Sequence, residues 1–283
     1  MGAALRSARL ALTAISETPG LDAEILLGRA LDCGRSHLHA HPEAMVSEPQ
    51  RQLFDRLVER RAHDEPLAYI LGVREFWSLS LHVTPEVLIP RPETELLVEL
   101  ALARIPEGAP WNIADLGTGS GAIALAVARE RPDTRIIATD ISEAALRLAA
   151  DNAARLGITN ACFLAGDWFE SMRGRFHVII SNPPYVAADD PHLQSAALQY
   201  EPHAALISGT NGLADLSRIV QSASAFLRPG GWLMLEHGFE QGAAVRKLFE
   251  EAGFSAIRTD RDLAGRERVT LGLRSRDSAY TQD

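Results

Sequence analysis

Five residues, SNPPY at positions 181–185, follow directly after the apolar segment FHVII. Two adjacent prolines remove two backbone N–H groups, and they push the residue before each proline toward an extended conformation. The segment is therefore rigid, and its backbone offers mainly hydrogen-bond acceptors. Asparagine and proline are also common where a turn simply ends a strand. The neighbouring motifs decide between a turn and a site of chemistry.

A glycine-rich loop, DLGTGSGA at residues 115–122, lies between a predicted strand and a predicted helix. Glycines let the backbone approach a ligand closely, and the start of the following helix presents free N–H groups. The candidate ligand-binding residues of this loop are Gly117, Thr118, Gly119, Ser120 and Gly121. Gly117, Gly119 and Ala122 also fit the dinucleotide-binding pattern, so the loop alone does not identify the cofactor.

Acidic and aromatic residues end the next two predicted strands. Asp140 lies about 20 residues after the glycines, where a carboxylate can accept hydrogen bonds from both hydroxyls of a ribose. The alternative is that Asp140 caps the helix that follows it. Asp167 could accept from an exocyclic adenine amine while Trp168 covers the ring, although a surface turn also explains this pair.

These strand ends should meet at one edge of a parallel sheet, which is where such sheets bind ligands. A planar amide or aromatic amine nitrogen is a poor nucleophile, because its lone pair is delocalised into the neighbouring π-system. The side-chain oxygen of Asn182 and the carbonyl of Pro183 could each accept one of its N–H groups, with Tyr185 packed against the plane. Such orientation lowers a reaction barrier appreciably and requires neither a metal nor a covalent nucleophile.

The composition sets limits on the class of protein. The chain has 283 residues, of which 46% are hydrophobic and 23% are charged, as in ordinary globular proteins. Its net charge of -9 argues against a broad phosphate-binding surface, and so against a nucleic-acid substrate. Cys33 and Cys162 match neither a disulfide framework nor a zinc spacing. No apolar stretch is long enough to span a membrane and no secretory signal is evident, so we expect a cytoplasmic protein.

The residues before the glycine loop predict two smaller segments. Apolar residues recur at helical spacing over residues 1–73, which predicts a bundle of helices. Residues 74–90 predict a β-hairpin linker, with one strand in FWSLSLHVT at 76–84 and a second in EVLI at 86–89.

From residue 91 to residue 274, predicted strands and helices alternate. A helix begins at Pro92, and further helices are predicted near residues 212–227 and 240–252. Such alternation predicts an α/β domain with a mostly parallel sheet and helices on both faces. Residues 275–283 show no apolar periodicity and predict a loose tail.

The four motifs at the strand ends resemble those of class I S-adenosylmethionine-dependent methyltransferases that act on an NH2 group. The NPPY motif occurs in such enzymes for adenine in nucleic acid and for glutamine in protein. Four other motifs, together with the helical segment, resemble the HemK-type peptide chain release factor glutamine methyltransferases over nearly the whole chain. These motifs are LIPRPETE at 88–95, YEPHAAL at 200–206, LEHGFEQG at 235–242 and RDLAGRERVTLG at 261–272.

The resemblance implies a Rossmann-like fold with a seven-stranded sheet whose last strand is antiparallel, and an N-terminal domain that docks the substrate. The implied substrate is the glutamine of the Gly-Gly-Gln motif in class 1 release factors, and the implied product is S-adenosylhomocysteine. We expect a monomer. By this resemblance S-adenosylmethionine is held by Gly117, Thr118, Gly119, Gly121, Asp140, Trp168 and Asn182, with Asp167 as a weaker candidate. The implied glutamine pocket comprises Asn182, Pro183, Pro184 and Tyr185, of which Asn182, Pro183 and Tyr185 are the candidate catalytic residues.

One segment, ISGTNGL at 207–213, departs from the paired glycines and acidic residue that the family more often shows. Arg91 and Glu93 could line the substrate entrance, but a salt bridge between domains or a carboxylate at a helix start explains them as well. Glu236 and His237 end a strand near the same edge, and a supporting role is open for both.

Three other functions remain as alternatives. An adenine methyltransferase acting on nucleic acid would need a basic groove and a target-recognition module. A nicotinamide-dependent oxidoreductase would explain the glycine loop and Asp140, but it leaves the NPPY motif without a purpose. A binding protein that keeps the fold without turnover is the third alternative.

Overall fold

The computed structural model describes residues 1–195 and 198–275 of the chain. They form two compact units, here called the helical unit and the sheet unit. The helical unit comprises residues 1–73 and the described part of 194–200, and the sheet unit comprises 74–193 and the described residues from 201 onward. The first unit is therefore discontinuous in sequence.

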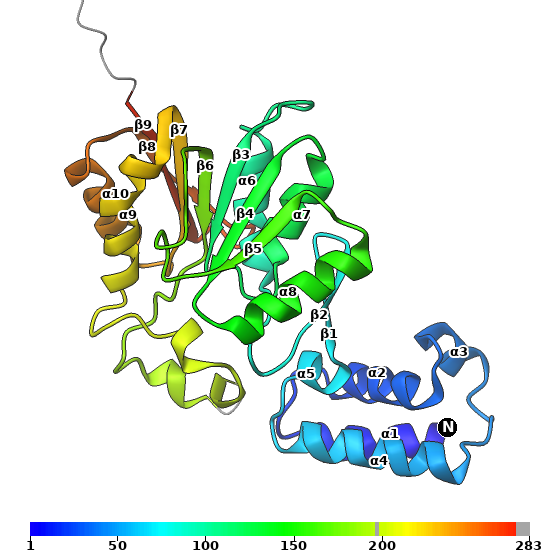
Figure 1. The fold of residues 1–283 in the computed structure, drawn as a ribbon. Coiled ribbons are helices and arrows are strands. Elements are labelled where there is room, and N and C mark those ends of the chain that lie inside the picture. Colours follow the sequence, from blue (N-terminus) through cyan, green and yellow to red (C-terminus); the bar gives the residue numbers. More distant parts are fainter. Residues whose placement is uncertain (196–197, 276–283) are drawn as a thin grey trace, which may run out of the picture. The chain divides into compact units, whose positions relative to one another are not determined.

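The helical unit is built from five helices, as the apolar periodicity of its sequence predicts (Figure 1). They are α1 (Gly2–Leu12), α2 (Pro19–Leu31), α3 (Arg35–Ala40), α4 (Glu48–Ala62) and α5 (Leu67–Leu71). Leu12, Leu26 and Phe54 are fully buried in its core. The Tyr200 hydroxyl donates to the carbonyl oxygen of His63 at 2.8 Å, which fastens the late segment to this unit.

The β-hairpin differs from its prediction. Its strands are β1 (Val73–Phe76) and β2 (Leu79–His82), and the segment at 86–89 forms no strand. The turn falls at Trp77 and Ser78, both of which have positive φ angles of 50° and 57°. The prediction of one strand over 76–84 was therefore wrong.

The turn lacks the glycine or asparagine that usually marks positive φ, so the sequence gives no local sign of it. Distant side chains stabilise it instead. The backbone N–H of Trp77 donates to Glu95 at 2.9 Å, and its indole N–H donates to Glu130 at 3.2 Å.

The sheet unit contains a seven-stranded sheet in the order β5-β4-β3-β6-β7-β9-β8. Strands β3 (Asn112–Leu116), β4 (Arg135–Asp140), β5 (Ala161–Ala165), β6 (Phe176–Ser181) and β7 (Leu227–Glu236) pair in parallel. The last strand, β9 (Glu267–Arg274), runs antiparallel to both β7 and β8 (Phe254–Arg261). The mostly parallel sheet and its antiparallel last strand were both predicted, and both are confirmed.

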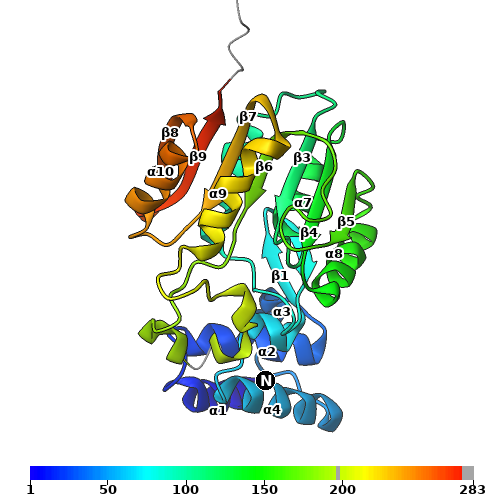
Figure 2. The ribbon, with the colours of Figure 1, turned by 60° about the vertical axis from the view of Figure 1, so that its left-hand side comes forward.

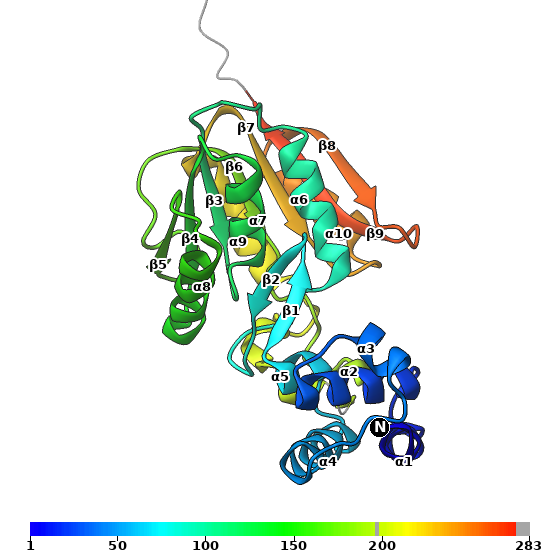
Figure 3. The ribbon, with the colours of Figure 1, turned by 90° about the vertical axis from the view of Figure 1, so that its right-hand side faces the viewer.

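Helices cover both faces of the sheet, as the alternation of elements predicts (Figures 2 and 3). Helices α6 (Glu95–Leu102), α7 (Ala122–Glu130) and α8 (Glu143–Leu156) pack with the hairpin on one apolar core. Helices α9 (Ala214–Phe226) and α10 (Gly242–Glu251) pack on the other. The helix predicted from Pro92 begins as a short 3-10 turn, Pro92–Thr94, before α6. Three further 3-10 turns are Pro191–Gln194, Leu198–Tyr200 and His203–Ala205.

No helix in residues 1–195 and 198–275 is both long and apolar enough to cross a membrane. The predicted loose tail, 275–283, lies outside the described residues except for Ser275.

The segment that departs from the family pattern contains a backbone constraint. Gly212 has a φ angle of +70°, and a Cβ atom added there would lie 2.2 Å from the carbonyl oxygen of Tyr185. Gly108 has nearly the same φ angle, +69°, but nothing lies within 4 Å of an added Cβ. Substitutions at these two glycines can therefore distinguish the cost of backbone strain from the cost of steric overlap.

We predict that Gly108→Ala lowers the free energy of unfolding by about 1 kcal/mol, the strain of a left-handed residue. Gly212→Ala should lower it by about 3 kcal/mol, because the methyl group also displaces the Tyr185 backbone. Urea denaturation of both variants measures the difference. Equal losses of unfolding free energy would show that the backbone around Tyr185 can shift at no energetic cost.

Candidate active site

A cavity of about 430 Å³ lies at the carboxyl edge of the sheet, within the sheet unit. The register explains why predicted residues meet there, because Leu116 pairs with both Thr139 and Ser181, and Asp140 pairs with Ala165. The predicted site residues that line the cavity are Gly117, Thr118, Gly119, Ser120, Asp140, Asp167, Trp168, Asn182 and Pro184. Gly121, Pro183 and Tyr185 were also predicted, but they do not line it.

The glycine loop is held close to its surroundings. Gly117, Gly119 and Gly121 have φ angles of 68°, 56° and 84°. A Cβ atom on Gly117 would lie 3.1 Å from the indole ring of Trp168, whereas one on Gly121 would press on Leu125. Gly117 therefore lets the loop approach the cavity wall, and Gly121 lets α7 begin.

Asp115 anchors this loop from inside the protein. Its Oδ2 accepts from the Thr118 hydroxyl at 2.6 Å and from the Ala124 N–H at 3.2 Å. Its Oδ1 is buried and accepts no hydrogen bond from the described part of the chain. Burial raises the pKa of Asp115 to about 7, and the nearby charge of Asp140 acts in the same direction.

Asp140 points both carboxylate oxygens at backbone N–H groups beside the cavity. Oδ2 accepts from Gly119 and Oδ1 accepts from Ser142, each at 2.9 Å. The alternative interpretation of Asp140 as the cap of α8 is wrong, since the Ser142 side chain accepts from Ala145 in that role. Each oxygen of Asp140 keeps acceptor capacity, because a carboxylate has about four lone-pair sites.

Trp168 adopts a strained backbone conformation, with a φ angle of 52°. Its carbonyl oxygen accepts from the Thr139 hydroxyl at 3.0 Å, which stabilises that conformation. The indole Nε1 is buried, and no acceptor for it occurs in residues 1–195 and 198–275. A buried donor without an acceptor costs free energy unless a ligand supplies one.

Asp167 is partly engaged by a residue that the sequence analysis missed. Its Oδ2 forms an ion pair with Arg218 of α9 at 2.6 Å. Both residues line the cavity. Arg218 lies 51 positions from Asp167, so no local pattern could reveal this pair.

Asn182 and Tyr185 take different positions after β6. The Asn182 Nδ2 donates to the hydroxyl of Thr94 at 3.2 Å, and both residues line the cavity. The Tyr185 hydroxyl instead donates to Glu236 at 3.2 Å, and burial raises the pKa of Tyr185. Thr94 belongs to the LIPRPETE motif, yet nothing in its residue type singled it out.

Arg91 lines the cavity and forms an ion pair with the buried Glu201. Burial raises the pKa of Glu201, and the Arg91 charge opposes that shift. Both residues belong to the sheet unit, so the expected salt bridge between domains is a contact within one unit. It links the segments around residues 88–95 and 200–206.

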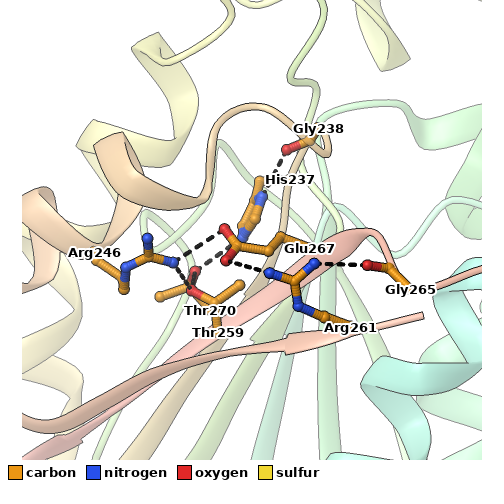
Figure 4. Close-up of polar contacts among 8 residues, drawn as sticks. All are labelled: His237, Gly238, Arg246, Thr259, Arg261, Gly265, Glu267 and Thr270. Carbon is orange, nitrogen blue, oxygen red and sulfur yellow. Dashed lines mark hydrogen bonds and ion pairs between the residues drawn. The ribbon is translucent and has the colours of Figure 1, made fainter.

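His237 is a structural residue rather than part of the cavity (Figure 4). Its Nδ1 lies 2.8 Å from the Gly238 carbonyl and therefore donates, which leaves Nε2 to accept from Thr270 at 2.9 Å. Thr259 lies 2.8 Å from Thr270 and accepts from Arg246 at 2.8 Å. Burial lowers the pKa of His237, which favours the neutral ring.

A sheet of this order, with a glycine-rich loop after β3 and an Asn-Pro-Pro-Tyr segment after β6, defines a class I methyltransferase. A methyltransferase from Pyrococcus furiosus shows the same fold, with a TM-score of 0.55 at 18% identity, covering 77% of this chain and 98% of that one. Family models described as "PrmC N-terminal domain" and "Methyltransferase small domain" match residues 3–72 and 93–200.

The chain belongs to the release factor glutamine methyltransferase family. It is 50% identical to the release factor glutamine methyltransferase of Xylella fastidiosa, over 92% of this chain and 96% of that protein. It is 52% identical to the one of Yersinia pestis, over 91% of this chain and 93% of that protein.

We predict that Asp115 makes the stability of the fold depend on pH. Because the folded protein keeps this proton up to pH about 7, the stabilising contribution is present at low pH and is lost as pH rises through that value. Between pH 5 and pH 8 the wild type should lose about 3 kcal/mol more unfolding free energy than Asp115→Asn.

Urea denaturation at both pH values measures this difference. Asp133→Asn, which alters an exposed carboxylate, is the matched control and should follow the wild type. Parallel curves for wild type and Asp115→Asn would contradict the assignment of the proton to Asp115.

Proposed function

We propose that this protein transfers a methyl group from S-adenosylmethionine to the side-chain amide nitrogen of the glutamine in the Gly-Gly-Gln motif of class 1 release factors. The observation that carries the proposal is the Asn182-Pro183-Pro184 segment at the carboxyl edge of the sheet, beside the glycine loop. The identity of about 50% to release factor glutamine methyltransferases, over more than nine-tenths of the chain, supports the substrate.

The residues around the cavity fit S-adenosylmethionine. A volume of about 430 Å³ is within the range of small-molecule sites. Asp140 has acceptor capacity suited to ribose hydroxyls, and the unpartnered indole N–H of Trp168 calls for an acceptor. The cofactor supplies an electrophilic methyl group on a positively charged sulfur.

We assign cofactor binding to the loop and strand-end residues that line the cavity. These are Gly117, Thr118, Gly119, Ser120, Asp140, Trp168 and Asn182. Gly121 contributes indirectly by allowing the start of α7. Asp167 is a weaker candidate, because Arg218 already engages one of its oxygens.

In the proposed reaction the chain orients a weak nucleophile. The Asn182 side-chain oxygen and the Pro183 carbonyl accept the two N–H groups of the glutamine amide, which directs its lone pair toward the methyl group. Asn182 does not act as a base, since an amide side chain takes up no proton near neutral pH. The proton that the glutamine nitrogen loses after methylation passes to water. Pro184 borders the cavity, and Tyr185 supports the pocket through its bond to Glu236.

The remaining parts of the proposal concern partners. The match of residues 3–72 to the PrmC N-terminal domain supports the helical unit as the part that docks the release factor. The net charge of -9 favours a protein substrate over a nucleic acid. We also propose that the protein is a monomer and acts in the cytoplasm, where translation takes place.

Methyl transfer from labelled S-adenosylmethionine to a purified class 1 release factor tests this function. We expect label on the wild-type factor and none on a factor whose Gly-Gly-Gln glutamine is replaced by alanine. Adenine-containing DNA serves as a third sample. Label on DNA would support the nucleic-acid alternative, and cofactor binding without label on any sample would overturn the proposal.

We predict that Asn182→Ala lowers the methylation rate by at least ~100-fold, the scale of losing one preorganised dipole. Its affinity for S-adenosylmethionine, measured by calorimetry, should stay within a few-fold, because the glycine loop and Asp140 remain. Equal rates in mutant and wild type would refute the orienting role of Asn182.

A further inference from the structure

The NPPY motif contains a span that cannot hold itself in place. Pro183 and Pro184 have no backbone N–H, so neither can donate a hydrogen bond to the protein around it. The proposed reaction nevertheless needs the Pro183 carbonyl to keep one direction, because it accepts an N–H of the substrate amide. The position of this span therefore depends on what holds the residues at its two ends.

Strand β6 holds the first end of the span. Its last residue, Ser181, pairs with Leu116 of β3 on one side and with Leu235 of β7 on the other. The Ser181 hydroxyl also donates to the Leu116 carbonyl at 2.7 Å. Asn182 therefore leaves the sheet from a fixed point.

The second end is the peptide group between Tyr185 and Val186. Its N–H belongs to Val186 and donates to the Leu206 carbonyl at 2.9 Å. Its carbonyl belongs to Tyr185 and accepts from the side-chain Nε2 of Gln241 at 2.9 Å. Gln241 lies 56 positions further along the chain, directly before α10. Two hydrogen bonds thus fix the two sides of one peptide plane.

The Gln241 side chain uses both ends of its amide. Its Oε1 accepts from the Gly238 N–H at 2.8 Å, and its Nε2 donates to the Gly212 carbonyl at 3.3 Å as well as to Tyr185. A backbone N–H only donates and a backbone carbonyl only accepts, so these partners fix which end of the amide faces which way. Neither a glutamate nor an apolar side chain of similar size can make this set of contacts.

Gly212 allows one amide to reach both carbonyls. A Cβ atom on Gly212 would lie 2.2 Å from the Tyr185 carbonyl oxygen and 2.7 Å from Nε2 of Gln241. The segment at 207–213 therefore comes this close to Tyr185 only because residue 212 is a glycine.

We infer that Gln241 is a positioning residue, which fixes the Tyr185 end of the NPPY motif and with it the direction of the Pro183 carbonyl. With Ser181 and Tyr185 both held, the fixed φ angles of the two prolines leave the span little freedom. This inference rests on the proposed function, in which the Pro183 carbonyl accepts from the substrate amide. Gln241, Gly212 and Tyr185 do not line the cavity, so Gln241 should affect methyl transfer rather than cofactor binding.

Gln241→Met tests the inference directly, because it keeps the length of the side chain but removes both ends of the amide. We expect kcat for release factor methylation to fall about 10- to 100-fold, since a misplacement of about 1 Å can cost on the order of 100-fold. The KM for S-adenosylmethionine, and its affinity measured by calorimetry, should change less than about threefold. Weaker cofactor binding with an unchanged kcat would contradict the inference.

Gln241→Glu separates positioning of the NPPY motif from support of the local turn. The carboxylate can still accept from the Gly238 N–H, but it places an oxygen, instead of an NH2 group, against the carbonyls of Tyr185 and Gly212. We therefore expect kcat to fall at least as far as in Gln241→Met. A Gln241→Glu enzyme with wild-type kcat would show that Gln241 only supports its own turn, and would overturn the inference.

Asn160→Asp is the matched control. The Asn160 Nδ2 donates to the carbonyls of Ala128, Arg131 and Thr134 at 3.1, 3.3 and 3.2 Å. Asn160 lies just before β5, at the opposite end of that strand from the cavity. This variant also sets a carboxylate against backbone carbonyls, but far from the NPPY motif, so its kcat should match the wild type. Equal falls of kcat in Asn160→Asp and Gln241→Glu would overturn the inference.

Hydrogen exchange tests the inference without any measurement of activity. The Val186 N–H shares its peptide group with the Tyr185 carbonyl, so its protection should depend on Gln241. In valine-labelled protein, the NMR signal of this amide is the one lost in Val186→Ile. We expect its exchange to be at least about tenfold faster in Gln241→Met and unchanged in Asn160→Asp.

Two outcomes of these experiments are distinguishable. Equal exchange at Val186 in Gln241→Met and the wild type would overturn the inference, even where release factor is methylated. A wild type that fails to methylate a release factor would refute the proposed function, whereas the exchange result decides separately whether Gln241 holds the peptide group.

Discussion

The parallel pairing of β3 with β4 and β6 is the constraint on which the site depends. Its register brings the glycine loop, Asp140 and Asn182 to one edge, although these residues lie far apart in sequence. The strand pairing sets this arrangement, and contacts between the strand ends, such as the Gly119 N–H donating to Asp140, add to it. The topology of the sheet therefore determines where the cavity lies, independently of the residue types that line it.

Beneath this edge, two buried carboxyl groups support the two halves of the cavity. Asp115 ties the glycine loop to α7, and Glu236 lies under the NPPY segment. Burial raises the pKa of each to about 7. Asp115 accepts from the hydroxyl of Thr118, which lines the cavity, and Glu236 accepts from the hydroxyl of Tyr185.

Local patterns in the sequence predict the class of sheet and nine of the 26 residues that line the cavity, whereas the antiparallel last strand was expected from the family resemblance. Alternating apolar runs and glycines carry that information within a few positions of each other. Thr94 and Arg218 could not be predicted, because their partners lie 88 and 51 positions away. The hairpin turn at Trp77 and Ser78 was missed for a similar reason, since Glu95 and Glu130 stabilise residues that have no turn propensity of their own.

The discontinuity of the helical unit has a consequence for synthesis of the chain. Its five helices lie within the first 73 residues, but its described boundary includes Tyr200, whose hydroxyl bonds to His63. During translation these helices emerge early and can form, yet the unit stays incomplete until β3 to β6 have been made. A fragment cut at residue 73 would lack this late segment. Cutting the chain there therefore does not separate the helical unit from the sheet unit.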